Sequence, residues 1–428
     1  MKWYGMYVRI LFLFNLIYSK SITISFTGKN VIQPKKELRM NKIGMTNSLD
    51  LINYRNNIYL IDAWIGQQQK FSLVLDTGSS DTWVRGPKCK PHELENSGSN
   101  NQRFDNSCEG AKLNTSDSSV KDLGKQVVIK YLDESTTKLD IYKVPIAIGT
   151  SKSVIPIGVS TEQVGFPIGD GILGLGLDNQ SIITKQSGIS SNVFDSFNFT
   201  TYENIFGIYF SQEEDNICGC ITLGGIEPSK FIGPITYFPI QNATHWQFKI
   251  NQFKMMIQSM KFNFNTTTIV LDSGTTNIIL NDIMAKSINE KLGAILLQNH
   301  STIYQIDCSK LNSLPIISFL INGIQIQFDS RIYIQKMSLD NKSLVCTSRF
   351  HGGGGDYMIF GMVFHRQFYT IYDKFNRRVG FARAIHAGKS VVNDSVLLDW
   401  TDGNENNALT MPYFYSSLAW GLIFAFNL

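Results

Sequence analysis

The chain has 428 residues, enough for two lobes that each bury a substantial core, and a formal net charge of +4, too small to indicate a nucleic-acid partner. Charged residues make up 17% and aromatic residues 12%, a balance that favours a β-rich extracellular protein over a helical cytosolic one. The histidines are not grouped at metal-ligand spacing, and GxxxxGK[ST], CxxC and HExxH motifs are absent, so neither a metal nor an organic cofactor is expected.

The N-terminal end is typical of a secretory signal peptide. Residues 1–19 combine basic residues with an apolar run over 10–18, and small Ser19 ends the segment. The run is too short for a membrane span, so we predict cleavage near Ser19; an amphipathic core strand is the alternative. Residues 20–48 are basic, with a single acidic residue.

A short motif recurs in the two halves of the chain, where an apolar run ends in Asp-[Thr/Ser]-Gly-[Ser/Thr]-[Ser/Thr]. The first copy is FSLVLDTGSSDTWV at 71–84, and the second is TTIVLDSGTTNIIL at 267–280. Short apolar runs bounded by turn residues predict buried strands, so each aspartate is expected near the interior. The motif residues are Asp76, Thr77, Gly78 and Ser79 in the first copy and Asp272, Ser273, Gly274 and Thr275 in the second.

The residue types of this motif suit acid–base chemistry. Gly78 and Gly274 permit tight turns in which backbone N–H groups approach the carboxylates, and Ser79 and Thr275 can donate hydrogen bonds to them. If the two turns meet, their carboxyls cannot both ionise easily and share a proton. One can then act as the acid and the other as the base on a water between them. A single Asp-Thr-Gly is an ordinary surface turn, but two copies after buried-type strands indicate a paired site.

These motifs resemble those of pepsin-like aspartic proteases, the family of pepsin, cathepsin D, the yapsins and β-secretase, over about residues 51–384. The second copy, which continues to Asn277, is most similar to the β-secretase and yapsin variant. The resemblance implies an all-β, bilobal fold with pseudo-twofold related lobes and a central cleft. We expect the N-terminal lobe at 49–212 and the C-terminal lobe at 213–388, related by an internal repeat of about 170 residues.

The resemblance also implies supporting roles. Thr77 and Ser273 match the paired hydroxyl residues that lock the two turns together. The segments DGILGLG at 170–176 and IFG at 359–361 match strands that cross behind the turns. Residues 20–48 match a short propeptide whose lysines would cover the catalytic aspartates and favour their ionised, inactive form; a basic leader without a function is the alternative.

A flap over the site is implied by the residues around Tyr131. This residue matches the flap tyrosine of the family, which hydrogen-bonds the residue that matches Trp83. The chain carries Leu132 and Glu134 where the family usually has glycines, which predicts a stiffer or differently shaped flap. A plain exposed hairpin is the alternative.

Secretion permits disulfides and glycans. The resemblance implies three bridges, Cys89–Cys108, Cys218–Cys220 and Cys308–Cys346. The second encloses one residue, which would strain it, so free thiols are the alternative there. Sequons that predict glycosylation where they are exposed begin at Asn114, Asn179, Asn198, Asn242, Asn265, Asn299, Asn341 and Asn393.

The C-terminal end predicts a lipid anchor. Residues 389–410 form a polar stalk, and residues 411–428 form an uncharged apolar tail that ends the chain. A small-residue site, a polar spacer and such a tail are typical of glycosylphosphatidylinositol (GPI) attachment, here expected near Gly403 or Asn404. Some yapsins carry such anchors. A single-pass membrane span is the alternative.

The sequence is therefore interpreted as a surface-anchored aspartic endopeptidase with Asp76 and Asp272 as its catalytic pair. Its partners are expected to be protein or peptide substrates and, through the anchor, the membrane; it is expected to act as a monomer. A single-pass membrane protein or a vacuolar or lysosomal location is the alternative. The competing functional class is a catalytically inactive homologue that binds peptides or serves as a surface antigen, which the altered flap keeps open.

Overall fold

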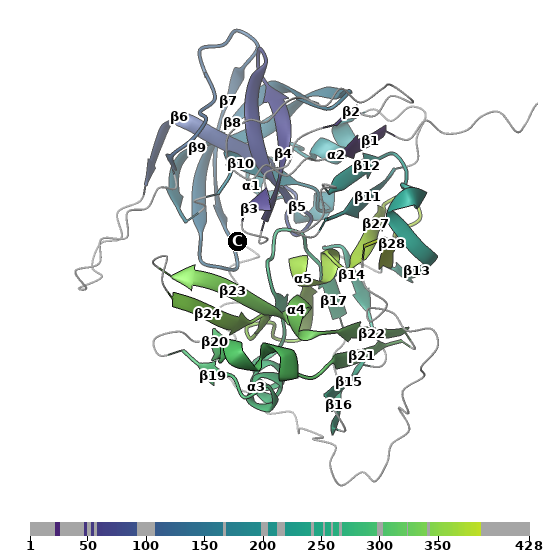
Figure 1. The fold of residues 1–428 in the computed structure, drawn as a ribbon. Helices are drawn as coiled ribbons and strands as arrows, with labels where there is room; N and C mark the ends of the chain where they lie inside the picture. Colours follow the sequence, from purple (N-terminus) through teal and green to yellow (C-terminus); the bar gives the residue numbers. More distant parts are fainter. Residues whose placement is uncertain are drawn as a thin grey trace, which may run out of the picture.

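The structure is a computed structural model, drawn in Figure 1. It describes residues 22–25, 47–48, 53–54, 58–91, 108–165, 168–197, 204–211, 219–240, 244–250, 253–257, 260–264, 268–297, 303–322, 324–339 and 343–386. The predicted signal peptide, stalk and tail lie outside these residues, and so do Cys218, Gly403 and Asn404.

An eight-stranded sheet dominates the first half of the chain and fills the upper part of Figure 1. Its order is β3-β4-β5-β10-β6-β9-β8-β7, and β4 also pairs with β8, which curls the sheet. The strand β5 lies between antiparallel β4 and parallel β10, so its end is enclosed on both sides. The strands are β3 (Asn53–Tyr54), β4 (Ile58–Ile65), β5 (Gln69–Asp76), β6 (Trp83–Pro91), β7 (Lys121–Lys130), β8 (Thr136–Ile148), β9 (Ser151–Val164) and β10 (Gly171–Gly174).

The strand β5 shows how the sequence directs the first motif inward. Phe71, Leu73 and Leu75 are buried and alternate with less buried residues, as expected for a period of two. Burial of each such side chain is worth about 1.5–3 kcal/mol, which holds this register firmly. The strand ends at Asp76, where the turn begins.

Three smaller sheets form the second half of the chain, in the lower part of Figure 1. Their orders are β14-β17-β26-β18-β25, β16-β15-β21-β22 and β19-β20-β24-β23. The strands are β14 (Gln247–Lys249), β15 (Phe253–Ile257), β16 (Met260–Phe264), β17 (Thr268–Leu271), β18 (Ile278–Ile279), β19 (Ile295–Leu296), β20 (Tyr304–Ile306), β21 (Ile317–Ile321), β22 (Ile324–Phe328), β23 (Ile334–Leu339), β24 (Ser343–Ser348), β25 (Phe350–His351) and β26 (Tyr357–Phe360).

A seven-stranded sheet joins the two halves, in the order β13-β28-β27-β11-β12-β1-β2. Because β11 pairs with β27, the end of the predicted N-terminal lobe lies beside the end of the predicted C-terminal lobe. Here the ring of Phe206 stacks on that of Tyr372 at 4.6 Å between centroids. The strands are β1 (Ile22–Ser25), β2 (Asn47–Ser48), β11 (Ile205–Tyr209), β12 (Cys220–Leu223), β13 (Phe231–Pro239), β27 (Phe368–Asp373) and β28 (Arg378–Ala384).

Helices are short and lie at the ends of strands. They are η2 (Asp178–Gln180), α1 (Ile182–Ser187), α2 (Val193–Ser196), η3 (Pro228–Lys230), α3 (Asp282–Lys291), η4 (Cys308–Ser313), α4 (Ser330–Tyr333) and α5 (Met362–His365). The all-β, bilobal fold expected from the sequence is confirmed. Within the described ranges, the structure contains no helix with the length and apolar character that a membrane crossing needs.

Candidate active site

The first turn leaves β5 at Asp76 and folds back onto its own carboxylate. The backbone N–H of Gly78 donates to Asp76 Oδ1 at 2.8 Å, and the hydroxyl of Ser79 donates to Asp76 Oδ2. Asp76 is 6% exposed, so it is largely desolvated yet still in contact with solvent. The local sequence thus supplies both hydrogen bonds that orient this carboxyl.

The second turn repeats this geometry at the end of β17. Gly274 N–H donates to Asp272 Oδ1 at 2.8 Å, and the hydroxyl of Thr275 donates to Asp272 Oδ2 at 2.6 Å. Asp272 is 8% exposed. The two copies of the motif therefore fold alike.

The two turns face each other across the junction of the lobes. A Cβ added to Gly78 would lie 2.6 Å from Asp272 Oδ2, and one added to Gly274 would lie 2.7 Å from Asp76 Cγ. Each turn needs glycine because the other lobe's carboxyl occupies the space of a side chain. Burial, and then the charge of Asp272, raises the pKa of Asp76 to about 7. The pair can therefore hold one shared proton over a wide pH range.

Thr77 and Ser273 tie the two turns together. Thr77 N–H donates to Ser273 Oγ at 3.0 Å, and Ser273 N–H donates to Thr77 Oγ1 at 2.9 Å. Each hydroxyl then donates to a carbonyl of the opposite strand, Thr77 to Leu271 at 3.1 Å and Ser273 to Leu75 at 2.8 Å. Both N–H groups and both hydroxyls are buried and hydrogen-bonded, so the interface between the lobes fixes the distance between the two carboxyls.

A strand crosses behind each turn. β10 runs parallel to β5, and the N–H of Leu175 donates to Asp76 O at 2.7 Å. β26 runs parallel to β17, and Asp272 N–H donates to Phe360 O at 3.2 Å. A Cβ on Gly174 would meet backbone atoms of Ser80 at 2.5 Å, so the crossing requires glycine at that position.

Asp81 fixes the far side of the first turn, a role that the sequence did not reveal. Its carboxylate accepts hydrogen bonds from the Ser181 hydroxyl at 2.5 Å and from Ile182 N–H at 2.7 Å. Burial raises its pKa. The helix α1 that begins there also reaches the flap, because the Gln186 amide exchanges two 3.2 Å hydrogen bonds with the backbone of Val128. The partners of Asp81 lie about a hundred residues along the chain, where no local pattern points to them.

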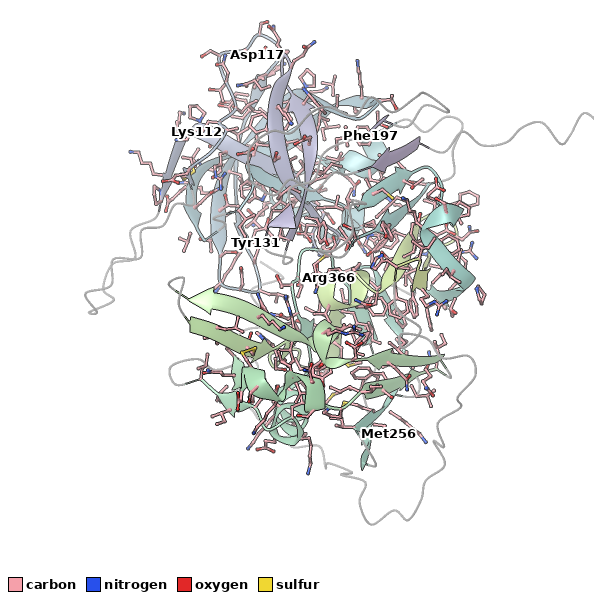
Figure 2. All side chains as sticks on the ribbon, viewed as in Figure 1. Lys112, Asp117, Tyr131, Phe197, Met256 and Arg366 are labelled. Atoms are coloured by element: carbon pink, nitrogen blue, oxygen red, sulfur yellow. A yellow bond between two sulfur atoms is a disulfide. The ribbon has the colours of Figure 1, made fainter. Side chains whose placement is uncertain are left out.

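The hairpin of β7 and β8 carries Tyr131 at its tip. Figure 2 places Tyr131 at the edge of the first lobe that faces the second. Trp83 Nε1 donates to the Tyr131 hydroxyl at 2.8 Å. Glu134 adopts a left-handed backbone with φ of 68° and forms an ion pair with Lys130, while Leu132 is 61% exposed. The tip is closed by backbone hydrogen bonds, from Tyr131 N–H to Ser135 O at 2.8 Å and from Glu134 N–H to Tyr131 O at 3.2 Å, and Glu134 holds a left-handed conformation that glycine would adopt more easily.

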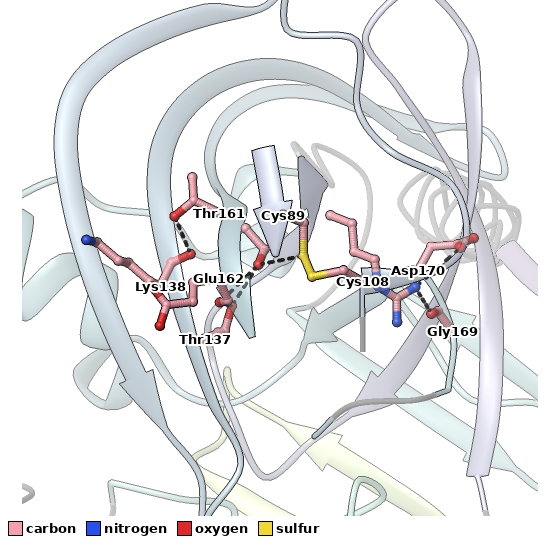
Figure 3. Close-up of a disulfide and its surroundings, with 10 residues drawn as sticks. Cys89, Cys108, Thr137, Lys138, Thr161, Glu162, Gly169 and Asp170 are labelled. Atoms are coloured by element: carbon pink, nitrogen blue, oxygen red, sulfur yellow. Dashed lines mark hydrogen bonds and ion pairs between the residues drawn. A yellow bond between two sulfur atoms is a disulfide. The ribbon is translucent and has the colours of Figure 1, made fainter. Parts of the chain in front are cut away.

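Two of the three expected disulfides are present. Cys89 is bonded to Cys108, and Cys308 to Cys346. Figure 3 shows the first bridge between the strands that carry Thr137 and Glu162 and the turn of Gly169 and Asp170.

Asp170 connects the first bridge to the site. Its carboxylate accepts hydrogen bonds from the N–H groups of Ser72, in β5, and of Ala111, each at 2.9 Å. Ala111 lies three residues after Cys108. The bridge therefore anchors the loop that packs against the strand carrying Asp76.

The expected bridge between Cys218 and Cys220 is wrong, because Cys220 is a free, buried thiol. It begins β12 in the hydrophobic core, and burial raises its pKa to about 12.

No group of three or more histidine, cysteine or carboxylate side chains among the described residues is arranged to hold a metal ion. Two buried, facing aspartates at the junction of two β lobes define a site of the aspartic-protease type.

Comparison with known proteins leads to the same class. The family model described as eukaryotic aspartyl protease matches residues 58–384. The chain is 28% identical over 350 residues to chymosin of Ovis aries, covering 80% of this chain and 85% of the relative. It is 26% identical over 395 residues to cathepsin D of Dictyostelium discoideum, covering 88% and 98%. Pepsin A of Suncus murinus is 30% identical over 344 residues, covering 78% and 82%. The chain belongs to the eukaryotic aspartyl protease family.

Proposed function

We propose that this protein is an aspartic endopeptidase that hydrolyses protein or peptide substrates with a water activated between Asp76 and Asp272. The observation that carries the proposal is the approach of each carboxyl to the glycine of the opposite turn, which leaves the acids facing each other. No cofactor enters the proposal.

The reaction follows from one proton shared by two acids. The ionised carboxylate takes a proton from the water, whose oxygen attacks the peptide carbonyl carbon. The protonated carboxyl donates its proton to the carbonyl oxygen, which gives a neutral tetrahedral intermediate. The intermediate collapses as the C–N bond breaks: the leaving nitrogen receives a proton from the acid that took it from water, and one hydroxyl of the intermediate returns its proton to the other carboxylate. The products are a carboxylic acid and an amine, and the pair again holds one proton. The proton that Asp76 or Asp272 carries at rest belongs to the pair rather than to one residue.

The hydroxyls and the flap have positioning roles in this proposal. Ser79 and Thr275 hold the outer carboxylate oxygens, and Thr77 with Ser273 sets their spacing. Tyr131, held by Trp83, closes over the substrate and excludes water.

The test is hydrolysis of an unfolded protein at acid pH by the purified secreted part of the chain. We expect cleavage that pepstatin-type inhibitors block and that Asp272→Asn abolishes. Glu290→Gln, a surface carboxylate on α3 with a side chain that is 61% exposed, is the matched control and keeps full activity. An inactive wild type that still binds peptides would instead support the inactive homologue that the flap substitutions keep open.

Processing of the N-terminal segment belongs to the same proposal. We propose a signal peptide at 1–19, a propeptide at 20–48 and lobes at 49–212 and 213–388. In support, β1 pairs antiparallel with β12, so part of the proposed propeptide adds a strand to the central sheet. Incubation of the purified zymogen at acid pH should shorten its N-terminus, and mass spectrometry would locate the new end.

The site of action is proposed from the sequence of the tail. Residues 389–410 would form a stalk, residues 411–428 a GPI signal, and the anchor would lie near Gly403 or Asn404, placing a monomeric enzyme at the cell surface. Phosphatidylinositol-specific phospholipase C should then release the protein from intact cells. Retention after this treatment would favour a membrane span, and recovery in vacuolar or lysosomal fractions would favour the internal location.

A further inference from the structure

His365 is the last residue of α5, the helix that follows β26, and is 0% exposed. Its Nδ1 lies 2.9 Å from the carbonyl oxygen of Gly361, and its Nε2 lies 2.8 Å from the hydroxyl of Tyr372. The same hydroxyl lies 3.4 Å from Oγ1 of Thr77, the residue that locks the first turn. A buried titratable ring is thus two contacts away from the residue that follows Asp76.

The protons in this chain can be assigned from what each atom can do. A carbonyl oxygen only accepts, so His365 Nδ1 carries a proton. In the neutral ring Nε2 is then unprotonated and acts as an acceptor. Tyr372 must then donate its proton to Nε2. The single hydroxyl proton of Thr77 goes to Leu271 O, and its oxygen accepts from Ser273 N–H. No proton therefore lies between Tyr372 and Thr77 while the ring is neutral.

Protonation of the His365 ring reverses the direction of the hydrogen bond between His365 and Tyr372. Both ring nitrogens of His365 then donate, so the Tyr372 oxygen accepts from Nε2 and its own proton is released. Its buried hydroxyl neighbours are Thr370 and Thr77, and Oγ1 of Thr77, at 3.4 Å, has a second lone pair beside the bond from Ser273 that can accept this proton. A hydrogen bond is thereby added to the lock on the side of Asp76.

We propose that His365 and Tyr372 are positioning residues of the catalytic pair, which act through Thr77 and tighten the first turn when His365 carries a second proton. This inference rests on the proposed proteolytic function. Misplacement of a reacting group by about 1 Å can cost about a hundredfold in rate, so a stiffer turn should raise kcat. Because neither residue touches substrate, KM should not change.

The surroundings of the ring are consistent with a titration in the acidic range where the enzyme would work. Burial lowers the pKa of His365 to about 4, against the raising effects of the Gly361 carbonyl and the charge of Asp272. Two aromatic rings also lie near it: that of Phe210, which directly follows β11, at 6.1 Å between ring centroids, and that of its neighbour Phe364 in α5, at 5.9 Å. Burial raises the pKa of Tyr372 well above its ordinary value, so this hydroxyl keeps its proton throughout.

The kinetic test compares Tyr372→Phe with Tyr209→Phe. Tyr209 makes the same kind of contact, a hydroxyl 2.6 Å from Nδ1 of His386, whose Nε2 faces the carbonyl of Arg366 at 2.7 Å. We expect Tyr372→Phe to lower kcat about fivefold below pH 4, the effect of one hydrogen bond, with KM unchanged and kcat near wild type at neutral pH. Tyr209→Phe should follow the wild-type pH profile. A loss of equal size at every pH would overturn the proposal.

His365→Leu, which fills a similar volume without an acceptor, leaves the Tyr372 proton to Thr77 at every pH. It should therefore keep the low-pH kcat of the wild type and carry it to neutral pH, whereas the double variant His365→Leu/Tyr372→Phe should match Tyr372→Phe at low pH, because His365 acts through Tyr372. A low-pH loss in His365→Leu, or losses that multiply in the double variant, would contradict the proposal.

A measurement that needs no activity separates this proposal from the function it rests on. In ¹⁵N spectra of histidine-labelled wild type at neutral pH, we expect the His365 signal, assigned by its absence in His365→Leu, to show the Nδ1–H tautomer. The pKa of His365 should fall in Tyr372→Phe, since the charge-assisted hydrogen bond that the charged ring loses is stronger than the ordinary one that the neutral ring loses. An Nε2–H tautomer, or an unchanged pKa, would overturn the positioning chain even in an active enzyme; an inactive wild type with the expected spectra would instead refute the proteolytic function.

Discussion

At Asp76 and at Asp272 alike, the N–H two residues later donates at 2.8 Å and a hydroxyl three residues later donates to the outer oxygen. Farther along the two copies diverge. Trp83 follows Asp76 by seven residues and holds the flap tyrosine, whereas Ile279 occupies the equivalent place after Asp272 and lies in β18. Asp81 becomes Asn277 in the second copy, 3.5 Å from Nη1 of Arg349.

This difference separates two demands on the site. The contacts that place the carboxyls are duplicated, because a proton shared by two acids needs both held equally. The flap, Asp81 and the chain from Thr77 to His365 occur on the first turn. In the proposed function the flap covers the substrate from this side only. Changes in the duplicated contacts, which we call the shared part, should therefore lower activity more than changes in the contacts of the first turn alone, which we call the one-sided part.

The largest effect is expected from the acids themselves. Asp76→Asn and Asp272→Asn should each lower kcat by about 10⁴-fold, since neither amide can take or give the proton that attack requires. Initial rates on a quenched fluorescent peptide measure this, with Glu290→Gln as the control. A residual activity of one variant more than about a hundredfold above that of the other would mean that the acids are not interchangeable parts of one pair.

The pH dependence should reveal the next largest effect. Because burial and the charge of Asp272 raise the pKa of Asp76 to about 7, the pair keeps its proton up to that pH, and activity should fall about tenfold per pH unit beyond it. The same shift acts on stability. The folded state retains a proton that the unfolded chain releases near pH 3.8, so this contribution is lost as the pH rises from about 4 to 7.

Thermal unfolding of wild type and Asp76→Asn across this window checks the stability effect. The wild type should lose stability relative to the variant as the pH rises. His365 acts in the opposite sense, because its lowered pKa costs stability as the pH falls from 6.5 to about 4. This effect is the same in wild type and variant, so it cancels in the comparison. Parallel curves would show that Asp76 does not carry the raised pKa.

Thr77 and Ser273, which lock the two turns together, should contribute equally to stability. Thr77→Val leaves Ser273 N–H without its acceptor, and Ser273→Ala leaves Thr77 N–H without its own. Each should lower the free energy of unfolding by about 1–3 kcal/mol, the cost of an unsatisfied buried donor. Urea unfolding at neutral pH measures both, with Thr244→Val, an exposed hydroxyl, as the control. A loss confined to one variant would show that the lock is not symmetric.

The sequence predicted the duplicated part well, since each piece of it is local. An apolar run, a glycine turn and a hydroxyl suffice to indicate how Asp76 and Asp272 are held, and resemblance supplied the crossing strands. The two long-range disulfides were also predicted, whereas the short one was wrong because Cys220 lies in the core at the start of β12.

The one-sided part could not be predicted in the same way, because its contacts join distant segments. Asp81 meets Ser181 and Ile182, and Tyr372 meets Thr77 from the other end of the chain. Neither His365 nor Tyr372 stands out in the sequence, where both lie among apolar residues of strand and helix type. Only tertiary packing shows that these polar groups share a buried path.

The smallest effect is expected at the flap, where the two turns differ most visibly. Tyr131→Phe removes the acceptor of Trp83 Nε1 but keeps the ring, so it should lower kcat/KM about fivefold, close to the value of one hydrogen bond. Trp83→Phe should cost slightly more, because it also loses packing against the core of Ile129 and Leu139. The double variant should lose less than the product of the two, since both changes break one contact. Tyr304→Phe in the second lobe is the matched control and should leave kcat/KM unchanged; independent, multiplying losses would show that the tryptophan does not act through the flap tyrosine.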